Sequence, residues 1–413
     1  MTRTLWTTIL TPPSVALGLL LAPHSVSAAV CNRILTAGSD IQAAINSAAA
    51  NSTICLQAGT YTPAATLVVN KPLTLQGCQG GVDPRPSKLT RRVPGGSRES
   101  KISGRGVLDT IVRITSNGVT LDGLEVFNGT GDLIDSPLSA SALDPIAIRN
   151  CIVHAATGDE GIQLRNANHA VIERNYVFDT TGDAINLCCG STYGVIRQNE
   201  ARQIRSADAA IYIYSLVSGI TALNHLVENN LVYDVLVNDA IKLGSKDGGD
   251  SLVQGATVRN NTVRDTQQDG ISVYMSGVDV RNNEVYRSGS ENGAIYVAFD
   301  VAGVEIDSNS IHDNGFTSDT RDTYGVRIGK GADHPTGVTV NYNCIVGNER
   351  GLYYNFTAGL SVLDATNNWW GSSSGPSGCT LCAGSGDSVS DNVNYSPALL
   401  APPSTPTACG TIP

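Results

Sequence analysis

Several features are scarce or missing in this 413-residue sequence, and each absence excludes a class of protein. After the N-terminal segment, no stretch approaches the roughly 18 consecutive apolar residues that a membrane-spanning helix needs. We therefore expect no membrane association. Basic residues are outnumbered, with 27 Lys and Arg against 37 Asp and Glu, and the formal net charge is −10 at pH 7. This charge repels nucleic acid, so we expect no nucleic-acid partner.

A second Cys-x-x-Cys pair is also missing. The motif Cys379-Thr380-Leu381-Cys382 has no such partner and no nearby His, which favours a disulfide or free thiols over a zinc site. The sequence nevertheless contains ten cysteines, which fit an exported protein. Together with Cys409, this motif could form a disulfide that fixes the C-terminal end of the fold.

The N-terminus has the pattern of a secretory signal peptide. Arg3 supplies a positive charge, residues 15–21 form the strongest apolar run, and Val26-Ser27-Ala28 is a small-residue cleavage site. We expect residues 1–28 to be removed and the mature protein to be secreted as a monomer. Residues 401–413 are rich in Pro, Thr and Ala and are predicted to be a C-terminal tail, without the hydrophobic end of a lipid anchor.

The strongest positive signal is a short phrase that recurs along the chain. It reads apolar, polar, small or Asn, Asn, any residue, apolar, as in residues 226–231 and 258–263. From residue 123 to residue 368 the mean spacing is about 27 residues, a period typical of solenoids. The second Asn of the phrase is Asn150, Asn175, Asn199, Asn230, Asn261, Asn283, Asn309, Asn343 or Asn368, and Gly123 fills the same position one coil earlier.

These phrases predict strands rather than helices, because they alternate apolar and polar residues and are rich in Val, Ile, Thr and Tyr. A second strand of the type Gly-Ile-x-Val lies between successive phrases, for example at 240–243 and 270–273. Two strands flank each Asn turn and another strand opens the next coil. We therefore predict an all-β, single-stranded parallel β-helix of about 10–12 coils over residues 29–400, with a short cap helix at about 40–50.

The recurrent Asn is predicted to be part of the scaffold. Asn tolerates the left-handed corner between two strands, and its amide can bond the backbone or the Asn of the next coil. A buried stack of such amides satisfies its own hydrogen bonds.

The repeats resemble those of the secreted right-handed parallel β-helices in the pectin-lyase-like superfamily. The resemblance rests on the phrase V-x-x-N-x-V with alternating G-I-x-V strands and extends over residues 31–400. Residues 40–77 resemble the N-terminal cap and first coil of such proteins, and 367–376 resemble a last coil. The resemblance implies the fold but not the activity, since this fold hosts lyases, hydrolases, epimerases and binding proteins.

The candidate site is the outward side of the Gly-Ile-x-Val strands, where the apolar residues point inward and the residue between them points out. Aromatic rings suit the apolar faces of sugars, and amides and charges suit their hydroxyl and carboxylate groups. An acidic edge, Glu160, Asp183, Asp208, Asp239 and Asp269, precedes these strands. The outward column itself is Gln163, Asn186, Tyr212, Lys242, Ser272, Tyr296, Arg327 and Tyr353.

We expect an extracellular polysaccharide as the ligand, and a polyuronide lyase is the first hypothesis. The catalytic candidates are Lys242 as base, Arg327 as holder of the sugar carboxylate, and Asp239 and Asp269. The aspartates could also bind calcium, although no cofactor is required by the sequence. Tyr212, Tyr296, Asn186 and Asp183 are the candidates for substrate binding.

Two alternatives stay open. A glycoside hydrolase would use paired carboxylates such as Asp239 and Asp269. Residues 182–185 and 326–330 loosely resemble the polygalacturonase pattern, but its His motif and aspartate doublet are absent. A non-catalytic surface or matrix solenoid is the other alternative, since an Asp before a strand often only caps a turn.

Other surfaces give weaker predictions. The outward residues of the strands beside the Asn turn, such as Arg259 and Arg264, are expected to be ordinary solvated surface. The insertion at 79–105 is rich in Lys and Arg and is either a solvated loop or a patch that guides a polyanion. With residues 129–145, it would wall a cleft over the Gly-Ile-x-Val strands in an enzyme. Cys31 and Cys55 are expected to form a disulfide in the cap.

Overall fold

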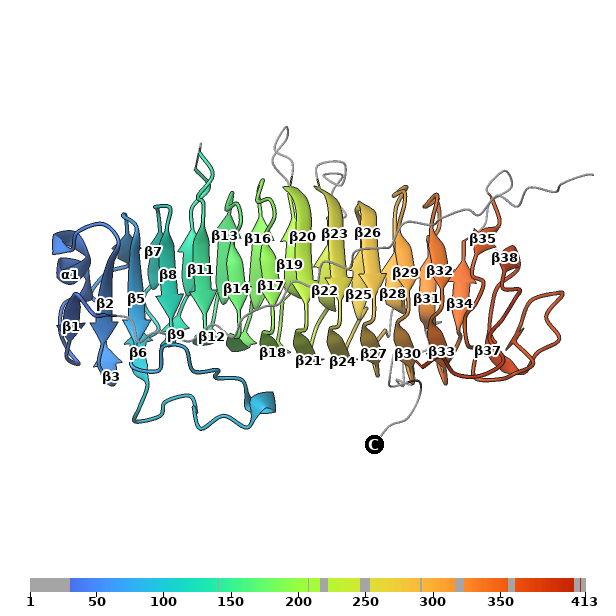
Figure 1. Cartoon of the computed structure of the whole chain (residues 1–413), viewed down its shortest axis with the longest axis horizontal. Helices are drawn as coiled ribbons and strands as arrows, with labels where there is room; N and C mark the ends of the chain where they lie inside the picture. The colour runs from blue at the N-terminus through green and yellow to red at the C-terminus, as the bar shows by residue number, and fades with distance from the viewer. Residues whose placement is uncertain are drawn as a thin grey trace, which may run out of the picture. The chain divides into compact units, whose positions relative to one another are not determined.

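The computed structural model describes residues 30–139, 141–206, 208–215, 222–245, 253–289, 292–315, 323–355, 361–404 and 409. Residues 1–28, with the predicted signal peptide, lie outside this range. In the described part the chain forms a parallel β-helix in which three long sheets run side by side along the coils (Figure 1). One short helix, α1 (Ile41–Ser47), lies near the N-terminal end, as the sequence predicts. No helix among the described residues has the length and apolar character needed to cross a membrane.

Sheet A is formed by the strands that precede the Asn turn of each coil. All of its strand pairs are parallel, and successive strands come from successive coils. Its strands are β1 (Arg33–Leu35), β2 (Ser52–Leu56), β5 (Leu73–Gly77), β8 (Val119–Asp122), β11 (Ile146–Arg149), β14 (Val171–Glu173), β17 (Val195–Arg197), β20 (Ala222–Glu228), β23 (Val253–Arg259), β26 (Ser276–Arg281), β29 (Glu305–Asp307), β32 (Thr339–Asn341), β35 (Leu363–Asp364) and β38 (Val393–Asn394).

Sheet B follows the Asn turn and is also entirely parallel. Its strands are β3 (Gly59–Tyr61), β6 (Ser100–Ser103), β9 (Leu124–Gly129), β12 (Ile152–Ala156), β15 (Tyr176–Thr180), β18 (Glu200–Ile204), β21 (Leu231–Val235), β24 (Thr262–Thr266), β27 (Glu284–Tyr286), β30 (Ser310–His312) and β33 (Cys344–Val346).

Sheet C contains the Gly-Ile-x-Val strands singled out in the sequence. It completes each coil, so every full coil has three strands. Its strands are β4 (Leu67–Val69), β7 (Val112–Ile114), β10 (Ile134–Ser136), β13 (Ile162–Arg165), β16 (Ile185–Cys188), β19 (Ala209–Tyr214), β22 (Asp239–Leu243), β25 (Ile271–Val273), β28 (Gly293–Val297), β31 (Tyr324–Ile328) and β34 (Leu352–Tyr354). The short strands β36 (Pro376–Ser377) and β37 (Gly386–Ser388) pair separately near the C-terminus.

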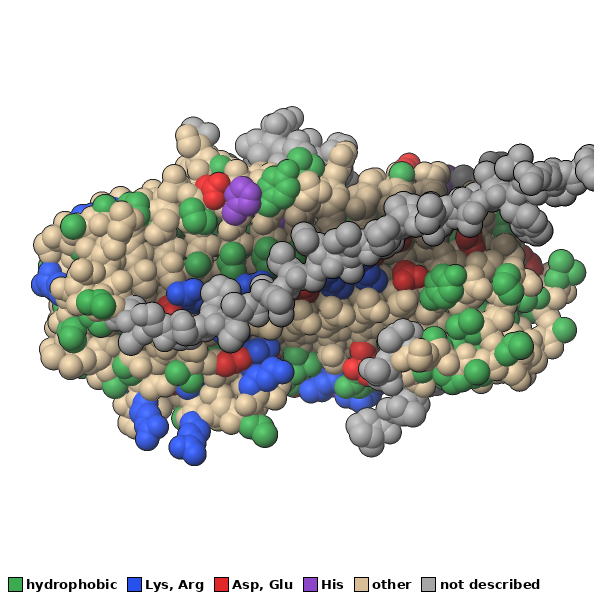
Figure 2. All heavy atoms as spheres, viewed as in Figure 1, with side chains coloured by type: hydrophobic (Ala, Val, Ile, Leu, Met, Phe, Trp, Pro, Cys, Tyr) green, Lys and Arg blue, Asp and Glu red, His purple; other side chains and the backbone are tan. Residues whose placement is uncertain are grey.

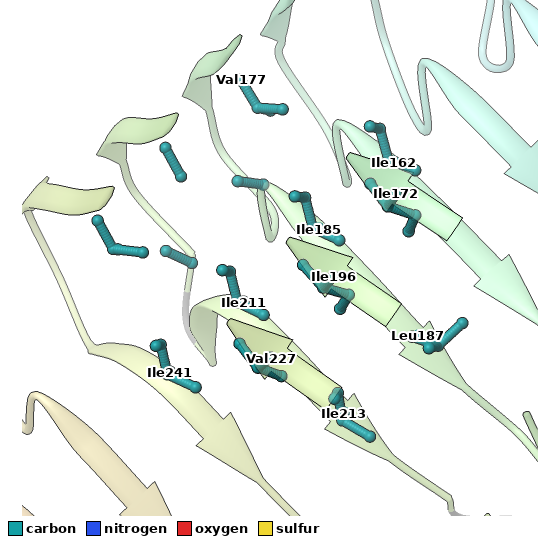
Figure 3. Close-up of a cluster of buried hydrophobic side chains, with 14 of the residues drawn as sticks. Ile162, Ile172, Val177, Ile185, Leu187, Ile196, Ile211, Ile213, Val227 and Ile241 are labelled. Atoms are coloured by element: carbon teal, nitrogen blue, oxygen red, sulfur yellow. The ribbon is translucent and has the colours of Figure 1, made fainter. Parts of the chain in front are cut away.

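The core consists of aligned apolar residues that repeat from coil to coil. In sheet C, Ile185 pairs with Ile211, and Ile211 with Ile241, while Ile196 of sheet A pairs with Val227. All five side chains are completely buried, and Figure 3 shows them projecting into the space between the sheets. Since burial of aliphatic side chains is the main stabilising term, the inward positions are committed to packing. Chemistry is left to outward positions.

A ladder of asparagine amides supports the turns between sheets A and B. The Oδ1 of Asn261 accepts hydrogen bonds from the backbone N and the Nδ2 of Asn230, one coil earlier, at 3.0 and 2.9 Å. Its Nδ2 donates in turn to Oδ1 of Asn283, one coil later. The same pattern runs without a break from Asn175 to Asn368. The proposed scaffold role therefore has a direct structural basis.

The ladder corrects two details of the sequence interpretation. The left-handed corner belongs to the residue before the ladder Asn, for example Asn260 at φ 55° and Arg174 at φ 53°. In the coil that contains Asn150, this residue itself occupies the corner. Cys151 stands at the ladder position, and its N–H donates to Oδ1 of Asn175. Gly123, at φ 69°, also occupies the corner. The doublet Asn-Asn hid this one-residue offset.

Disulfide bonds hold both ends of the described β-helix. Cys31 is bonded to Cys55, the pair expected from the sequence, and Cys344 of β33 is bonded to Cys409 in the C-terminal segment. The Cys-x-x-Cys motif forms its own disulfide, so its thiols are not metal ligands in this state. Vicinal Cys188 and Cys189 form a fourth bond. Four disulfides indicate folding in an oxidising environment.

Candidate functional site

The outward column expected on sheet C is present in register. Gln163 lies beside Asn186, Asn186 beside Tyr212, and Tyr212 beside Lys242. One polar or aromatic side chain is therefore contributed by each coil, at the strand spacing of roughly 4.8 Å. The column then continues through Ser272, Tyr296, Arg327 and Tyr353.

Lys242 is held between aromatic rings and a carboxylate. Its Nζ is 4.8 Å from the centroid of the Tyr212 ring and 5.7 Å from that of the Tyr274 ring, within the range of cation–π attraction. The Nζ also donates to Oδ1 of Asp208 at 3.1 Å. The Lys242 side chain is 2 % exposed, whereas that of Asp208 is 55 % exposed. A fixed, largely desolvated cation thus occupies the middle of the column.

Arg327 makes a similar arrangement farther along. Its guanidinium carbon is 5.3 Å from the centroid of the Tyr324 ring and 5.4 Å from that of the Tyr353 ring. Ser272 and Tyr296 lie between Lys242 and Arg327 in the register, so the two cations are three strand spacings apart. This is about 14 Å along the sheet. A group the size of one sugar ring cannot contact both cations.

Tyr296 belongs to a small aromatic cluster beside Lys242. Its ring meets that of Tyr274 edge-on, with centroids 5.9 Å apart, and Phe299 lies against Tyr274 at 5.3 Å. On the other side of Lys242, Tyr212 stacks on Tyr214 at 4.3 Å. These tyrosines are mostly buried, so the column is fixed before any ligand arrives.

The acidic edge caps the turns that lead into sheet C. Asp183 accepts from the Ser206 hydroxyl, from the Ala209 N–H and from Nδ2 of Asn186. Asp269 accepts from the backbone N–H groups of Asn292 and Gly293 at 3.1 and 3.0 Å. These contacts are what a turn-capping aspartate makes. Asp183 and Asp269 therefore cap these turns.

Asp239 and Asp269 lie close together at the start of successive coils of sheet C, and the Asp269 N–H donates to Oδ1 of Asp239 at 3.2 Å. The Ser272 hydroxyl lies 2.8 Å from Oδ2 of Asp239 and 3.4 Å from Oδ2 of Asp269, and both carboxylates are buried. Burial raises the pKa of Asp239, the Asp269 carboxylate raises it further, and Lys242 acts in the opposite direction. Burial likewise raises the pKa of Asp183 to about 7. Raised carboxyl pKa values near neutrality suit groups that exchange protons, although structural pairs show them too.

The column extends farther toward the N-terminus than the sequence indicated. Asp135 of β10 pairs with Gln163 and with Arg113 of β7. Its carboxylate accepts from Nε of Arg113 at 3.0 Å and from Nη1 of Arg165 at 2.6 Å. Residues 134–136 lack the Gly-Ile-x-Val phrase, so the repeat pattern does not mark this strand. The sequence signal for Asp135 is its spacing, because it lies one coil before Gln163.

Three acidic side chains beside this extension could hold a cation. Carboxylate oxygens of Asp132, Asp159 and Glu160 all lie within 4.8 Å of one another. Burial raises the pKa of Glu160 strongly, and hydrogen bonds with Asp132 and Asp159 raise it further. Arg165 already pairs with Asp132 at 3.4 Å, and a proton or a bound cation would balance the charge that remains. Buried oxygens of Glu160, Gln163 and Asn186 also lack hydrogen-bond donors, and oxygen ligands suit calcium.

Sheet B carries a second outward column that the sequence reading treated as ordinary surface. His154 stacks between Phe127 and Phe178, with centroids 5.2 and 4.7 Å apart and nearly parallel rings. The guanidinium of Arg264 lies 4.3 Å from the centroid of the Tyr233 ring. Because these groups cover one another's faces, their stacking adds to the stability of the sheet. The arginines of this sheet, which are partly exposed as expected, therefore also pack on aromatic rings.

The walls expected around sheet C are also different. The Ser87 N–H of the 79–105 insertion donates to Glu200 and the Gly95 N–H donates to Glu125, and both glutamates belong to sheet B. The insertion therefore lies on sheet B and does not wall sheet C. Residues 129–145 contribute β10, a strand of sheet C itself.

A band of acidic and basic side chains is visible along the middle of the surface in Figure 2.

Comparisons with known proteins agree with this architecture. Residues 224–392 match the family model described as the right handed beta helix region. The A-module of the Azotobacter vinelandii mannuronan C-5 epimerase AlgE6 superposes with a TM-score of 0.59 at 17% identity, covering 87% of this chain and 96% of that one. The A-module of AlgE4 from the same organism gives 0.55 at 14% identity, covering 79% and 96%.

An alginate lyase from Paenibacillus sp. str. FPU-7 gives a TM-score of 0.51 at 14% identity, covering 74% of this chain and 99% of that chain. No curated protein sequence matches this chain. At such identities the likeness extends to the fold and not to the activity. The chain is a right-handed parallel β-helix protein with the pectin-lyase-like fold, which it shares with enzymes that act on polysaccharides.

Proposed function

We propose that the protein binds an extracellular acidic polysaccharide along sheet C and cleaves it as a polyuronide lyase. One observation carries the proposal: an outward column with one polar or aromatic side chain per coil, including Lys242 and Arg327. A linear sugar chain is a repeating ligand, and a column with a regular spacing offers it repeating contacts. The disulfides support a location outside the reducing cytoplasm.

We assign the reaction centre to the surroundings of Lys242. Its ammonium group, positioned by Asp208 and two tyrosine rings, would stabilise the enolate that forms when the carbon next to the uronate carboxylate loses its proton. Because Lys242 forms an ion pair, we propose it as this cation rather than as the base first considered. The pair Asp239–Asp269, with a raised pKa at Asp239, is the acid–base candidate.

The remaining predicted residues have binding roles in this proposal. Arg327, about 14 Å away, would hold the carboxylate of another sugar unit. Tyr212 and Tyr296 would line the path, and Asn186 would offer its free Oδ1 to a hydroxyl group. Asp183 would position Asn186, from which it accepts a hydrogen bond at 2.7 Å. A calcium ion at Asp132, Asp159 and Glu160 would add positive charge for acidic sugars.

The test is incubation of the purified protein with alginate, pectate and a neutral glucan, with and without calcium. A lyase releases unsaturated products that absorb in the ultraviolet, whereas a hydrolase releases reducing ends without that absorbance. Lys242→Met should abolish turnover, because a transition-state charge interaction is worth several kcal/mol. Lys71→Met removes an equal charge outside sheet C and is the matched control. Full activity of Lys242→Met would refute this site.

A non-catalytic binding protein is the second candidate. It is favoured by the hydrogen bonds that occupy Asp183 and Asp269 in their turns. A binding protein would release no product from any polymer, and the double variant Lys242→Met, Arg327→Ala would weaken affinity without any effect on turnover.

A further inference from the structure

The segment 78–99, here named the basic loop, connects β5 to β6 and contains the short 3₁₀ helix η1 (Pro86–Lys88). In Figure 1 it projects beside the edge where the strands of sheet B are labelled, and Figure 2 shows basic side chains on this projection. Its position on sheet B separates it from the column on sheet C.

Arg92 anchors the basic loop from within. Its guanidinium forms an ion pair with Glu99 at 2.6 Å and donates to the carbonyl oxygens of Val82 and Asn150 at 2.9 and 2.5 Å. Arg92 is 4 % exposed and Glu99 is 1 % exposed. A buried, fully bonded ion pair of this kind fixes one geometry, because removing either partner would leave an uncompensated charge.

Two glutamates of sheet B hold the loop from outside. Glu125 accepts from the Gly95 N–H at 2.8 Å, and Glu200 accepts from the Ser87 N–H at 2.9 Å. Both glutamates are buried beneath the loop. Charge-assisted hydrogen bonds to backbone amides are strong, so the basic loop is held in one conformation and its outer surface is well defined.

The outer surface carries unbalanced positive charge. The acidic groups of the loop are already neutralised, since Asp83 pairs with Arg85 at 2.6 Å and Glu99 with Arg92. Three cations of the loop are exposed and form no ion pair with any residue that the structure describes. They are Lys88, Arg91 and Arg98. In a chain of net charge −10, this local surplus selects for anionic ligands.

The surface is also hollowed in two places. A hollow of about 390 Å³ is lined by basic side chains, by two carboxylates that are already ion-paired, and by three uncharged residues. The lining residues are Lys88, Arg91, Arg92 and Arg98, then Asp83 and Glu99, then Gln79, Val82 and Thr90. A second hollow of about 290 Å³ is lined by Arg91 and Arg98 as well, together with the ion-paired Glu99. Two neighbouring hollows that share two guanidinium groups fit successive acidic groups of a chain better than one isolated ion. Guanidinium groups bind carboxylates through two parallel hydrogen bonds.

We propose that the basic loop is a second binding site for an acidic polysaccharide, which holds the carboxylate or sulfate groups of a chain away from sheet C. The polymer class rests on the proposed function, whereas the requirement for an anionic chain rests on the loop alone. Such a site tethers a long polymer while sheet C acts on another segment, which raises the effective concentration of substrate.

The binding test uses a fluorescent alginate chain, with a neutral dextran of equal length as the control ligand. The variant removes the three exposed cations: Lys88→Ser, Arg91→Ser and Arg98→Ser. The matched control removes three other surface cations: Arg33→Ser, Lys71→Ser and Arg205→Ser. Both sets are made in a Lys242→Met, Arg327→Ala background, so that the result does not depend on the sheet C site. Thermal unfolding checks that both variants remain folded.

We expect the loop variant to bind alginate at least about tenfold more weakly than the control variant, with a smaller loss of affinity when salt is added. Equal affinity of the two variants would overturn the proposal. Leu89 in the loop is 94 % exposed, so vesicles containing anionic lipid are included as a further arm. Loop-dependent binding to these vesicles without loop-dependent binding to alginate would also overturn it. Loss of turnover in Lys242→Met alone bears only on the proposed function.

Discussion

Replacing Asn261 by Leu tests the polar support of the β-helix, because Leu has a similar volume but no hydrogen-bonding groups. The Asn261 side chain makes four hydrogen bonds. Its Oδ1 accepts from N and Nδ2 of Asn230, and its Nδ2 donates to the Val227 carbonyl oxygen and to Oδ1 of Asn283. Asn230 is 2 % exposed, so water cannot replace the lost acceptor without a rearrangement.

The magnitude follows from the donors left without a partner. The variant leaves the backbone N–H of Asn230 and one N–H of its side-chain amide without an acceptor. A buried unsatisfied polar group costs about 1–3 kcal/mol, so we expect a loss of about 2–6 kcal/mol in the free energy of unfolding. Urea unfolding followed by far-ultraviolet circular dichroism measures this loss through the shift of the midpoint.

The neighbouring Asn260 provides a control of the same chemistry. It lies at φ 55°, is exposed, and occupies the left-handed corner. Asn260→Gly should change stability by less than about 1 kcal/mol, because Gly accepts this conformation without strain. Equal midpoints for Asn261→Leu and Asn260→Gly would show that the amide ladder does not support the coils.

Three further outcomes are expected. Burial raises the pKa of Asp183 from 3.8 to about 7, so its contribution to stability is present below about pH 4 and is lost as the pH rises toward 7. The difference in unfolding midpoint between the protein and Asp183→Asn should therefore vary with pH in that window. A constant difference would contradict the assignment. Terbium luminescence should detect a cation site at Asp132, Asp159 and Glu160. Asp159→Asn should weaken terbium affinity about tenfold or more, while Asp179→Asn should leave the affinity unchanged. Equal affinity of the two variants would show that this cluster is not a cation site. Cys31→Ser should lower stability by about 3.5 kcal/mol, the chain-entropy value for a closed loop of 24 residues, and thermal unfolding of the variant beside the unchanged protein measures it.

Much of the fold could be predicted from the sequence because a solenoid repeats its local rules in every coil. Asn261 and Asn283 follow the same apolar and polar alternation, and each coil makes the same contacts with its neighbours. The register of sheet C followed from the same periodicity, so the alignment of Tyr212 with Lys242 could be expected before the structure was known. Because the coils stack, residues one period apart in the sequence lie side by side in the structure.

The contacts that decide chemistry are not periodic, and only the tertiary structure determined them. Asp135 joins the column although its strand lacks the repeated phrase, and the ion pair of Lys242 with Asp208 depends on a turn. The basic loop lies on sheet B because Glu125 and Glu200 bind its amides across large sequence separations. The scaffold can therefore be predicted from the sequence because its local contacts repeat. The site depends on insertions and turns, and their contact partners lie far away in the chain.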